Sequence, residues 1–77
     1  MLEVLGFYKF IKIRSLNKNK GLMKKFLIKN NSRGTIILAK EGMNGTISGE
    51  PNDIKKTVNK IKSIFSFKSF DNSNNSK

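Results

Sequence analysis

The side chains of this sequence that could do chemistry are mostly cationic. Its 77 residues include 16 lysines and arginines against five aspartates and glutamates, a formal net charge of +11 at pH 7, and it has neither cysteine nor histidine. Thiolate or imidazole metal sites, disulfides and Cys or Ser-His nucleophiles cannot be built from such a set. We therefore expect no catalytic residue, no metal site and no cofactor within the chain.

The excess positive charge favours an anionic partner. RNA is the natural candidate, because lysine and arginine neutralise phosphates and release counterions. A compositional bias competes equally with this interpretation, since all but two of the cations are lysines and asparagine and isoleucine are abundant, as happens in AT-rich genomes. Charge alone therefore supports RNA binding weakly.

The most specific motif is the run R-G-T-I-I-L-A-K-E-G-M-N-G-T-I-S-G of residues 33–49. Residues 34–39 are apolar and β-branched, which is typical of a strand buried on both faces, and residues 44–49 resume an alternating pattern. We predict a β-hairpin with a loop of about three to five residues, in which Gly42 supplies a positive φ. Asn44-Gly45 is the alternative position for the turn.

Several polar residues around this hairpin are candidates for binding. Those that flank the first strand and the hairpin, and that we select for RNA contact, are Lys9, Arg14, Arg33 and Lys40. Within the motif, one interpretation gives Glu41 an arginine partner across an interface and turns the amides near Gly42, Asn44 and Gly45 toward a phosphate or a linker. The competing interpretation is that the glycines and Asn44 only satisfy hairpin geometry.

The remaining chain alternates strand and helix patterns. Residues 4–13 are dense in aromatic and β-branched side chains and predict the first strand. Its rings are interpreted mainly as core, with Tyr8 and Phe10 as the only candidates for stacking on RNA. Residues 16–29 have helical spacing, with Ser15 as the N-cap, although Gly21 weakens the first turns and favours a start near Lys20.

The second half begins with Glu50 and Pro51, which suit a helix N-terminus and open the clearest amphipathic helix, to residue 65. Residues 66–70 would start a last strand, which we expect to be incomplete, and the polar residues 71–77 should be a disordered tail. The domain thus covers residues 1–70. The apolar run of residues 4–8 is too short for a signal peptide or membrane helix, so we expect a cytoplasmic protein without membrane contact.

The order β-α-β-β-α-β predicts an α+β, ferredoxin-like domain, in which two helices pack on one face of an antiparallel sheet. In that plan the first and third strands are usually central. This conflicts with a central, doubly buried strand at residues 34–39. The sheet face away from the helices is then the available binding surface.

Two stretches carry a family resemblance: V-L-G-F-Y-K-F at residues 4–10 and G-T-I-I-L-A-x-E-G-x-N-G-T-I-x-G at residues 34–49. Together they resemble the N-terminal domain of the rhodanese-related tRNA uridine hydroxylases (TrhO/YceA). The resemblance implies a ferredoxin-like or acylphosphatase-like fold and a role in binding or positioning tRNA. It also implies that a second, rhodanese-like domain with a loop cysteine performs the oxygen-dependent hydroxylation of the wobble uridine.

The resemblance stops before the catalytic half. The family continues into a P-F-x-x-L-K-V-K segment that leads to the rhodanese domain, and neither is present in residues 1–77. We expect no hydroxylase activity from this chain alone. It is either the product of a truncated or split gene or a piece of a longer protein, and a separately encoded rhodanese domain is one expected partner.

Two other classes of function compete with tRNA binding. Acylphosphatases share the fold and use an arginine and an asparagine, for which Arg14 and Asn44 are the candidates, but the phosphate-cradling loop of those enzymes has no counterpart in Ser15-Leu16-Asn17-Lys18. The other alternative is a gene remnant or a protein-interaction module.

Overall fold

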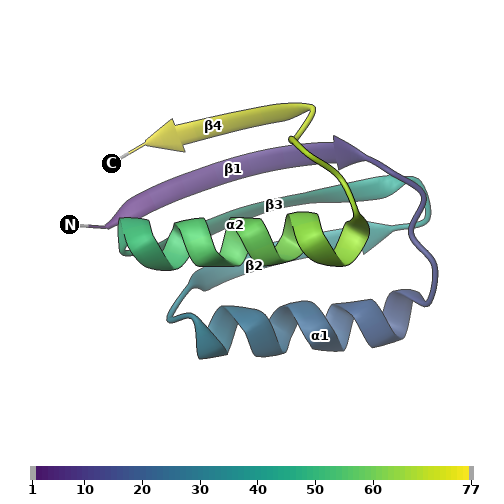
Figure 1. The fold of residues 1–77 in the computed structure, drawn as a ribbon, viewed down its shortest axis with the longest axis horizontal. Helices are drawn as coiled ribbons and strands as arrows, with labels where there is room; N and C mark the ends of the chain where they lie inside the picture. The colour runs from purple at the N-terminus through teal and green to yellow at the C-terminus, as the bar shows by residue number, and fades with distance from the viewer. Residues whose placement is uncertain (1, 77) are drawn as a thin grey trace.

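The computed structural model describes residues 2–76, which fold into a helix layer and a sheet layer (Figure 1). The elements follow the order β1 (Glu3–Phe10), α1 (Leu16–Lys29), β2 (Arg33–Ala39), β3 (Gly42–Gly49), α2 (Pro51–Phe65) and β4 (Asn72–Ser76). The strands form one antiparallel sheet in the order β2-β3-β1-β4. The predicted β-α-β-β-α-β plan is confirmed.

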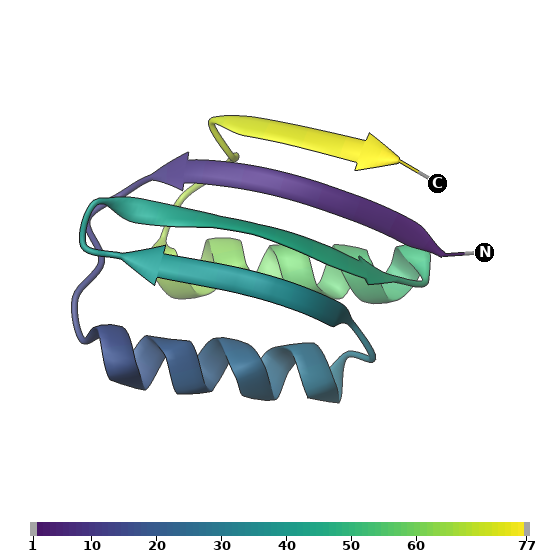
Figure 2. The same ribbon diagram turned by 180° about the vertical axis from the view of Figure 1, so that it is seen from behind.

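Both helices lie on one side of the sheet, and Figure 2 shows the other side uncovered. Strand alternation explains this layering, because Leu5 and Phe7 of β1 and Ile47 of β3 point toward the helices and are buried. The helices close the core with apolar side chains on their inner faces: Met23, Ile54 and Ile61. Residues at the intervening positions of the strands form the uncovered surface, which we call the open face.

The strand order confirms β1 and β3 as the central pair, but it contradicts a doubly buried strand at residues 34–39. These residues lie in β2, which is an edge strand. Leu38 faces the helices and is buried, whereas Ile37 faces the other way and is 56% exposed. An unbroken apolar run therefore marks an edge strand here, with one face left open.

The hairpin between β2 and β3 is tighter than predicted. Its loop is only Lys40 and Glu41, and Gly42 is already the first residue of β3. Gly42 does not have a positive φ; among the described glycines that conformation occurs at Gly34, with φ 130°. Gly42 is needed for a different reason, since a Cβ there would collide with the carbonyl oxygen of Lys9. Asn44-Gly45 lies within β3, so it is not the turn.

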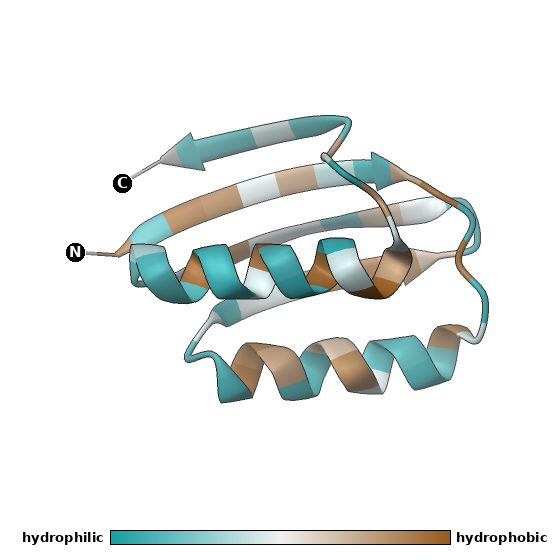
Figure 3. Ribbon diagram, in the orientation of Figure 1, coloured by the Kyte–Doolittle hydropathy of each residue, from teal (hydrophilic) through white to brown (hydrophobic). Residues whose placement is uncertain are grey.

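The end of the chain differs most from the prediction. Residues 66–70, predicted as the start of a strand, form the connection after α2, whereas residues 72–76 of the predicted disordered tail form β4 and pair antiparallel with β1. Lys77 lies outside the described residues. The side chains of residues 72–75 are all exposed, and Figure 3 shows how hydrophilic β4 is beside β1. Backbone pairing with β1, and not side-chain burial, therefore holds β4 in place.

Both helices begin near the residues that signalled a helix start in the sequence, but neither N-cap side chain makes a capping hydrogen bond. The first helix begins at Leu16 directly after Ser15, so the alternative start near Lys20, which Gly21 favoured, is wrong. The hydroxyl of Ser15 makes no capping hydrogen bond, because this residue is in the left-handed region at φ 52°. The side-chain amide of Asn19 donates to the carbonyl of Arg14 at 2.6 Å, and the backbone amide of Asn19 donates to the carbonyl of Ser15 at 3.0 Å. Pro51 occupies the first turn of α2, as predicted.

Candidate nucleic-acid interface

The open face consists of ordered rows of side chains across the four strands. The pairing register places Ile37, Asn44, Tyr8 and Asn72 in one row, from β2 through β3 and β1 to β4. The next row contains Thr35, Thr46, Gly6 and Asn74. Amides and hydroxyls therefore surround one aromatic ring and one position that has no side chain.

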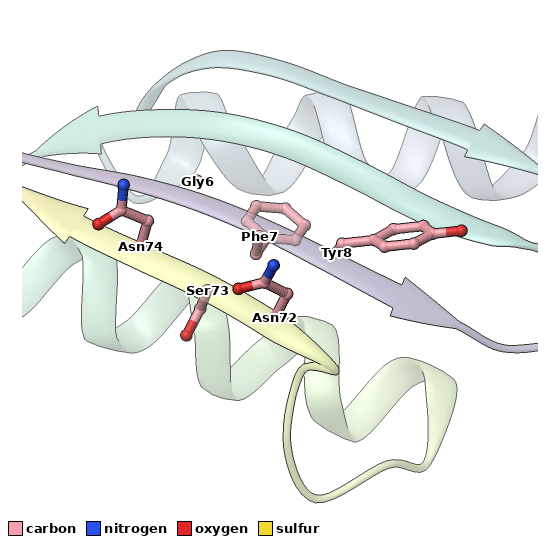
Figure 4. Close-up of a pocket in the computed structure, with 6 residues that line it drawn as sticks. All are labelled: Gly6, Phe7, Tyr8, Asn72, Ser73 and Asn74. Carbon is pink, nitrogen blue, oxygen red and sulfur yellow. The ribbon is translucent and has the colours of Figure 1, made fainter.

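That missing side chain leaves a hollow over Gly6. A cavity of about 210 Å³ is lined by Gly6, Phe7, Tyr8, Asn72, Ser73 and Asn74, and Figure 4 shows the amides of Asn72 and Asn74 reaching over β1. A second, wider depression of about 580 Å³ extends from Gly6 across β3 to β2 and reaches Thr35, Asn44 and Thr46. The two depressions meet at Gly6, and together we call them the Gly6 hollow.

Aromatic rings stand beside this hollow. Tyr8 and Phe10 follow one another on the open face, with ring centroids 4.7 Å apart and an edge-on arrangement. Phe10 is 64% exposed and Tyr8 is half-buried. These two rings, the candidates for exposure in the sequence, lie outside the buried core, and their stacking on RNA stays a prediction. Tyr8 is also the only tyrosine of the chain, which has no tryptophan.

The open face is nearly uncharged, although the chain carries a net charge of +11. Among the open-face positions of the described strands, the register includes one charged residue, Arg33. Arg33 is exposed at the beginning of β2, beside Ser48 of β3. The other cations selected from the sequence therefore lie elsewhere.

Lys9 lies on the helix side of β1 and is engaged there. Its Nζ is 3.4 Å from Oδ1 of Asp71 and 5.2 Å from the centroid of the Phe67 ring. The backbone amide of Phe10 donates to the same carboxylate at 2.6 Å. This backbone hydrogen bond, with a smaller contribution from Lys9, holds the pKa of Asp71 below its ordinary value near 3.8. Lys9 therefore fastens the connection before β4, and its side chain is only 19% exposed.

Arg14 and Lys40 are brought together at one end of the sheet. The backbone amide of Ile13 donates to the carbonyl of Lys40 at 3.0 Å and so ties the segment after β1 to the hairpin loop. The cleft between them has a volume of about 340 Å³ and is lined by Lys12, Ile13, Arg14, Ser15, Leu16 and Lys40. We call it the basic cleft. Sequence reasoning missed Lys12, although its place two residues before Arg14 was a usable signal.

The four selected cations therefore do not form one surface. Arg14 and Lys40 share the basic cleft, Lys9 is paired with Asp71, and Arg33 lies at the start of β2. Because β2 runs the full length of the sheet between Arg33 and the hairpin loop, Arg33 is at the opposite end from the cleft (Figure 1).

The glycines of the motif serve packing. A Cβ on Gly45 would lie 2.7 Å from the carbonyl oxygen of Thr35 and 2.9 Å from Cζ of Phe7, so the ring of Phe7 requires a glycine opposite it. The carbonyl of Glu41 accepts a hydrogen bond from the amide of Ile11 at 3.2 Å. Of Glu41, Gly42, Asn44 and Gly45, Asn44 is the one with a polar side chain on the open face, and it is not among the residues that line the basic cleft with Arg14.

Two structural features are absent from the part of the chain that the structure describes. No cluster of three or more acidic, histidine or cysteine side chains is placed to hold a metal ion. Neither α1 nor α2 is long and apolar enough to span a membrane.

Residues 2–77 match the family described as the UPF0176 acylphosphatase like domain. The chain belongs to this family. It is 60% identical over all of its 77 residues to the tRNA uridine(34) hydroxylase of Pelagibacter ubique (strain HTCC1062), of which it covers 26%. It is 40% identical over 53 residues, 69% of the chain, to the enzyme of the same name from Ehrlichia ruminantium (strain Welgevonden), of which it covers 20%. The resemblance to the N-terminal domain of these hydroxylases is confirmed.

The chain thus spans about a quarter or less of the length of these curated relatives. Among solved structures, a bacterial light-regulated adenylyl cyclase has a TM-score of 0.58 over 95% of this chain and 22% of its own, at 18% identity. A match at such low identity concerns the fold alone. The likeness therefore supports the fold of this domain and carries no argument about its activity.

Proposed function

We propose that this UPF0176 domain binds and positions tRNA for a tRNA uridine(34) hydroxylase. The observation that carries the proposal is the 60% identity, over the whole chain, to a protein with that name. The basic cleft supports it physically. The three cations that line this cleft, at one end of the sheet, give RNA phosphates a place to bind, with release of condensed counterions.

The chemistry of hydroxylation is assigned to residues outside this domain. The chain has no cysteine or histidine, and in the family that it resembles the hydroxylation depends on a rhodanese-like domain with a loop cysteine. That domain is supplied either by the rest of a longer polypeptide or by a separate chain. Residues 1–77 then contribute affinity and orientation, in the cytoplasm where tRNA is found, and no hydroxylation by themselves.

The test is a titration of the 77-residue chain with a tRNA anticodon stem-loop at several salt concentrations, with heparin as an unrelated polyanion. We expect tighter binding to the stem-loop, with an affinity that falls linearly on a logarithmic salt scale. Equal affinity for heparin would refute a tRNA-specific role and leave only a general attraction between opposite charges.

A charge-matched pair of variants locates the contact. In the first, Lys12, Arg14 and Lys40 of the basic cleft become glutamine. In the control, three lysines that are exposed on α1, Lys24, Lys25 and Lys29, become glutamine instead. Each lost phosphate contact reduces the salt slope by about 0.7 to 0.9. We expect the cleft variant to lose about 2 from the slope and the control to lose much less; equal losses would show that the cleft has no special part.

A further inference from the structure

The Gly6 hollow has the chemistry of a site for a flat, uncharged, heteroaromatic ring. Tyr8 lines one side with an aromatic ring, and Asn72, Asn74 and Asn44 offer amide donors and acceptors around the edge. Aromatic stacking tolerates any base, whereas side-chain amides can form hydrogen bonds with base edges. The floor is Gly6, so nothing holds a ring away from the backbone.

The distribution of charge separates this site from a phosphate site. Among the open-face positions of the described strands, Arg33 is the one charged residue, and it lies at the beginning of β2. The basic cleft lies beyond the opposite end of the same sheet. RNA whose phosphates follow these two ends would carry its bases across a neutral surface of one aromatic ring and several amides, as sheet-based binders of single strands do.

Resting on the proposed function, we propose that the Gly6 hollow binds one unpaired nucleobase of the RNA. The base stacks on Tyr8, and Asn72 and Asn74 of β4 contact its edge. The tail that looked disordered in the sequence thereby becomes one wall of the binding site. The occupant is a base that has left a helix, because a base pair in duplex RNA presents neither of its faces to a protein surface.

The chain contains its own probe for this contact. Because Tyr8 is the only tyrosine and no tryptophan is present, the tyrosine emission of the protein comes from one ring, which lines the hollow. The experiment titrates the 77-residue chain with a single-stranded RNA oligonucleotide and, separately, with an RNA duplex of the same length. We expect the single strand to quench Tyr8 emission and the duplex to bind without quenching it.

A pair of glycine variants tests occupancy of the hollow. A Cβ on Gly6 would lie an ordinary 3.9 Å from its nearest neighbours, the carbonyl oxygen of Asn74 and Oγ1 of Thr46, so the backbone accepts a side chain here, and the two methyl groups of Gly6→Val would extend into the hollow. Gly21→Val adds the same side chain on α1, where no heavy atom other than the adjacent backbone of the helix itself lies within 4 Å of the new Cβ. Single-strand affinity should fall about tenfold or more in Gly6→Val and remain unchanged in Gly21→Val. The salt slope should be the same in both.

The outcomes separate this inference from the proposed function. Salt-dependent stem-loop binding with unchanged Tyr8 emission, or with Gly6→Val as tight as the native chain, would overturn the base site and leave the tRNA role intact. Loss of tRNA preference over heparin refutes both. Quenching that rises with protein concentration in the absence of RNA would also overturn the inference, because it would show that a second copy of the chain occupies the hollow. Circular dichroism of Gly6→Val checks that the variant is folded.

Discussion

Two glycines of the central strand pair have opposite surroundings. Gly45 of β3 lies beneath the Phe7 ring on the helix side, where an added Cβ would be 2.7 Å from the carbonyl oxygen of Thr35. Gly6 of β1 faces the open side, where an added Cβ would be 3.9 Å from its nearest neighbours. One glycine is therefore needed for packing, and the other leaves a surface hollow.

This contrast predicts different costs for the same substitution. Gly45→Ala should lower the free energy of unfolding by about 1 to 3 kcal/mol, since overpacking a filled site displaces backbone or forces Phe7 from its rotamer. Gly6→Ala should change it by less than about 0.5 kcal/mol. Urea denaturation followed by circular dichroism measures both, and equal midpoints for the two variants would contradict the packing role of Gly45.

Asp71 predicts a dependence of stability on acid. Its pKa is lowered in the folded protein, first by the hydrogen bond from the Phe10 amide and then by Lys9. Its contribution is therefore fully present above the unfolded pKa, near 4, and is lost as the pH falls through the lower folded pKa. Asp71→Asn should be less stable than the native chain at pH 7, and the difference should shrink below about pH 4.

Denaturation midpoints of the two proteins at a series of pH values test this link. The remaining carboxylates titrate in both proteins, so only the difference between the midpoints reports on Asp71. A difference that stays constant down to pH 2 would mean that the carboxylate charge does not fasten the connection to β4.

At the scale of elements, the position of β4 depends on the connection between α2 and β4, residues 66–71. The strand itself buries none of its side chains from residues 72–75. Its position is set by the connection after α2, where Phe70 stacks on Phe7 with ring centroids 4.5 Å apart and Asp71 accepts from the Phe10 amide. The amide of Asp71 also donates to the carbonyl of Tyr8 at 2.9 Å, which begins the pairing with β1.

Phe70→Ala should therefore loosen β4 as well as the core. We expect a loss of about 2 kcal/mol, below the 3 to 5 kcal/mol of a fully buried phenylalanine because Phe70 is half-buried. The matched control is Phe10→Ala, which removes an exposed ring and one edge-on contact with Tyr8 and should cost less than about 1 kcal/mol. Hydrogen exchange of the β1 amides should accelerate in Phe70→Ala; unchanged exchange there would show that β4 is held independently of Phe70.

The sequence was most informative about the two helices and the central strands, where side-chain burial decides the structure. The helical spacing in residues 51–65 and the alternation around Leu5 and Phe7 reflect burial, so both helices and the central strands could be predicted. The sequence misled wherever the backbone decides. The strand β4 forms because β1 offers an unpaired edge, and a polar N-S-N-N-S run carries no sign of that edge.

The candidate site was predictable only in part for the same reason. The exposed rings of Tyr8 and Phe10 follow from the alternation within one strand. The Gly6 hollow needs the register of β3 and β4 against β1, which juxtaposes Thr46, Gly6 and Asn74. Likewise, the pairing of Lys9 with Asp71 joins residues 62 positions apart. No local pattern records such contacts, and so Lys9 was grouped with cations that it does not join.

At the scale of the whole molecule, 16 cations face five carboxylates in one small domain. Like charges at this density repel one another, and repulsion destabilises the compact state more than the expanded one. Raising the ionic strength from about 0.01 to 0.15 M shortens the screening length from about 30 to 8 Å. The thermal midpoint of the free protein should therefore rise with salt. A fall over that range would mean that attractive ion pairs dominate.

The pairing of β1 with β4 joins the two ends of the domain. The side-chain amide of Asn75 donates to Oε1 of Glu3, two residues that are 72 positions apart in the chain. A ribosome that has made β1 must therefore make all the other elements before the first strand gains its second neighbour, and contacts of such long sequence separation form slowly. Until then the aromatic β1 is exposed on the nascent chain, where chaperones would be expected to bind it. The open face is therefore the last part of this domain to be completed.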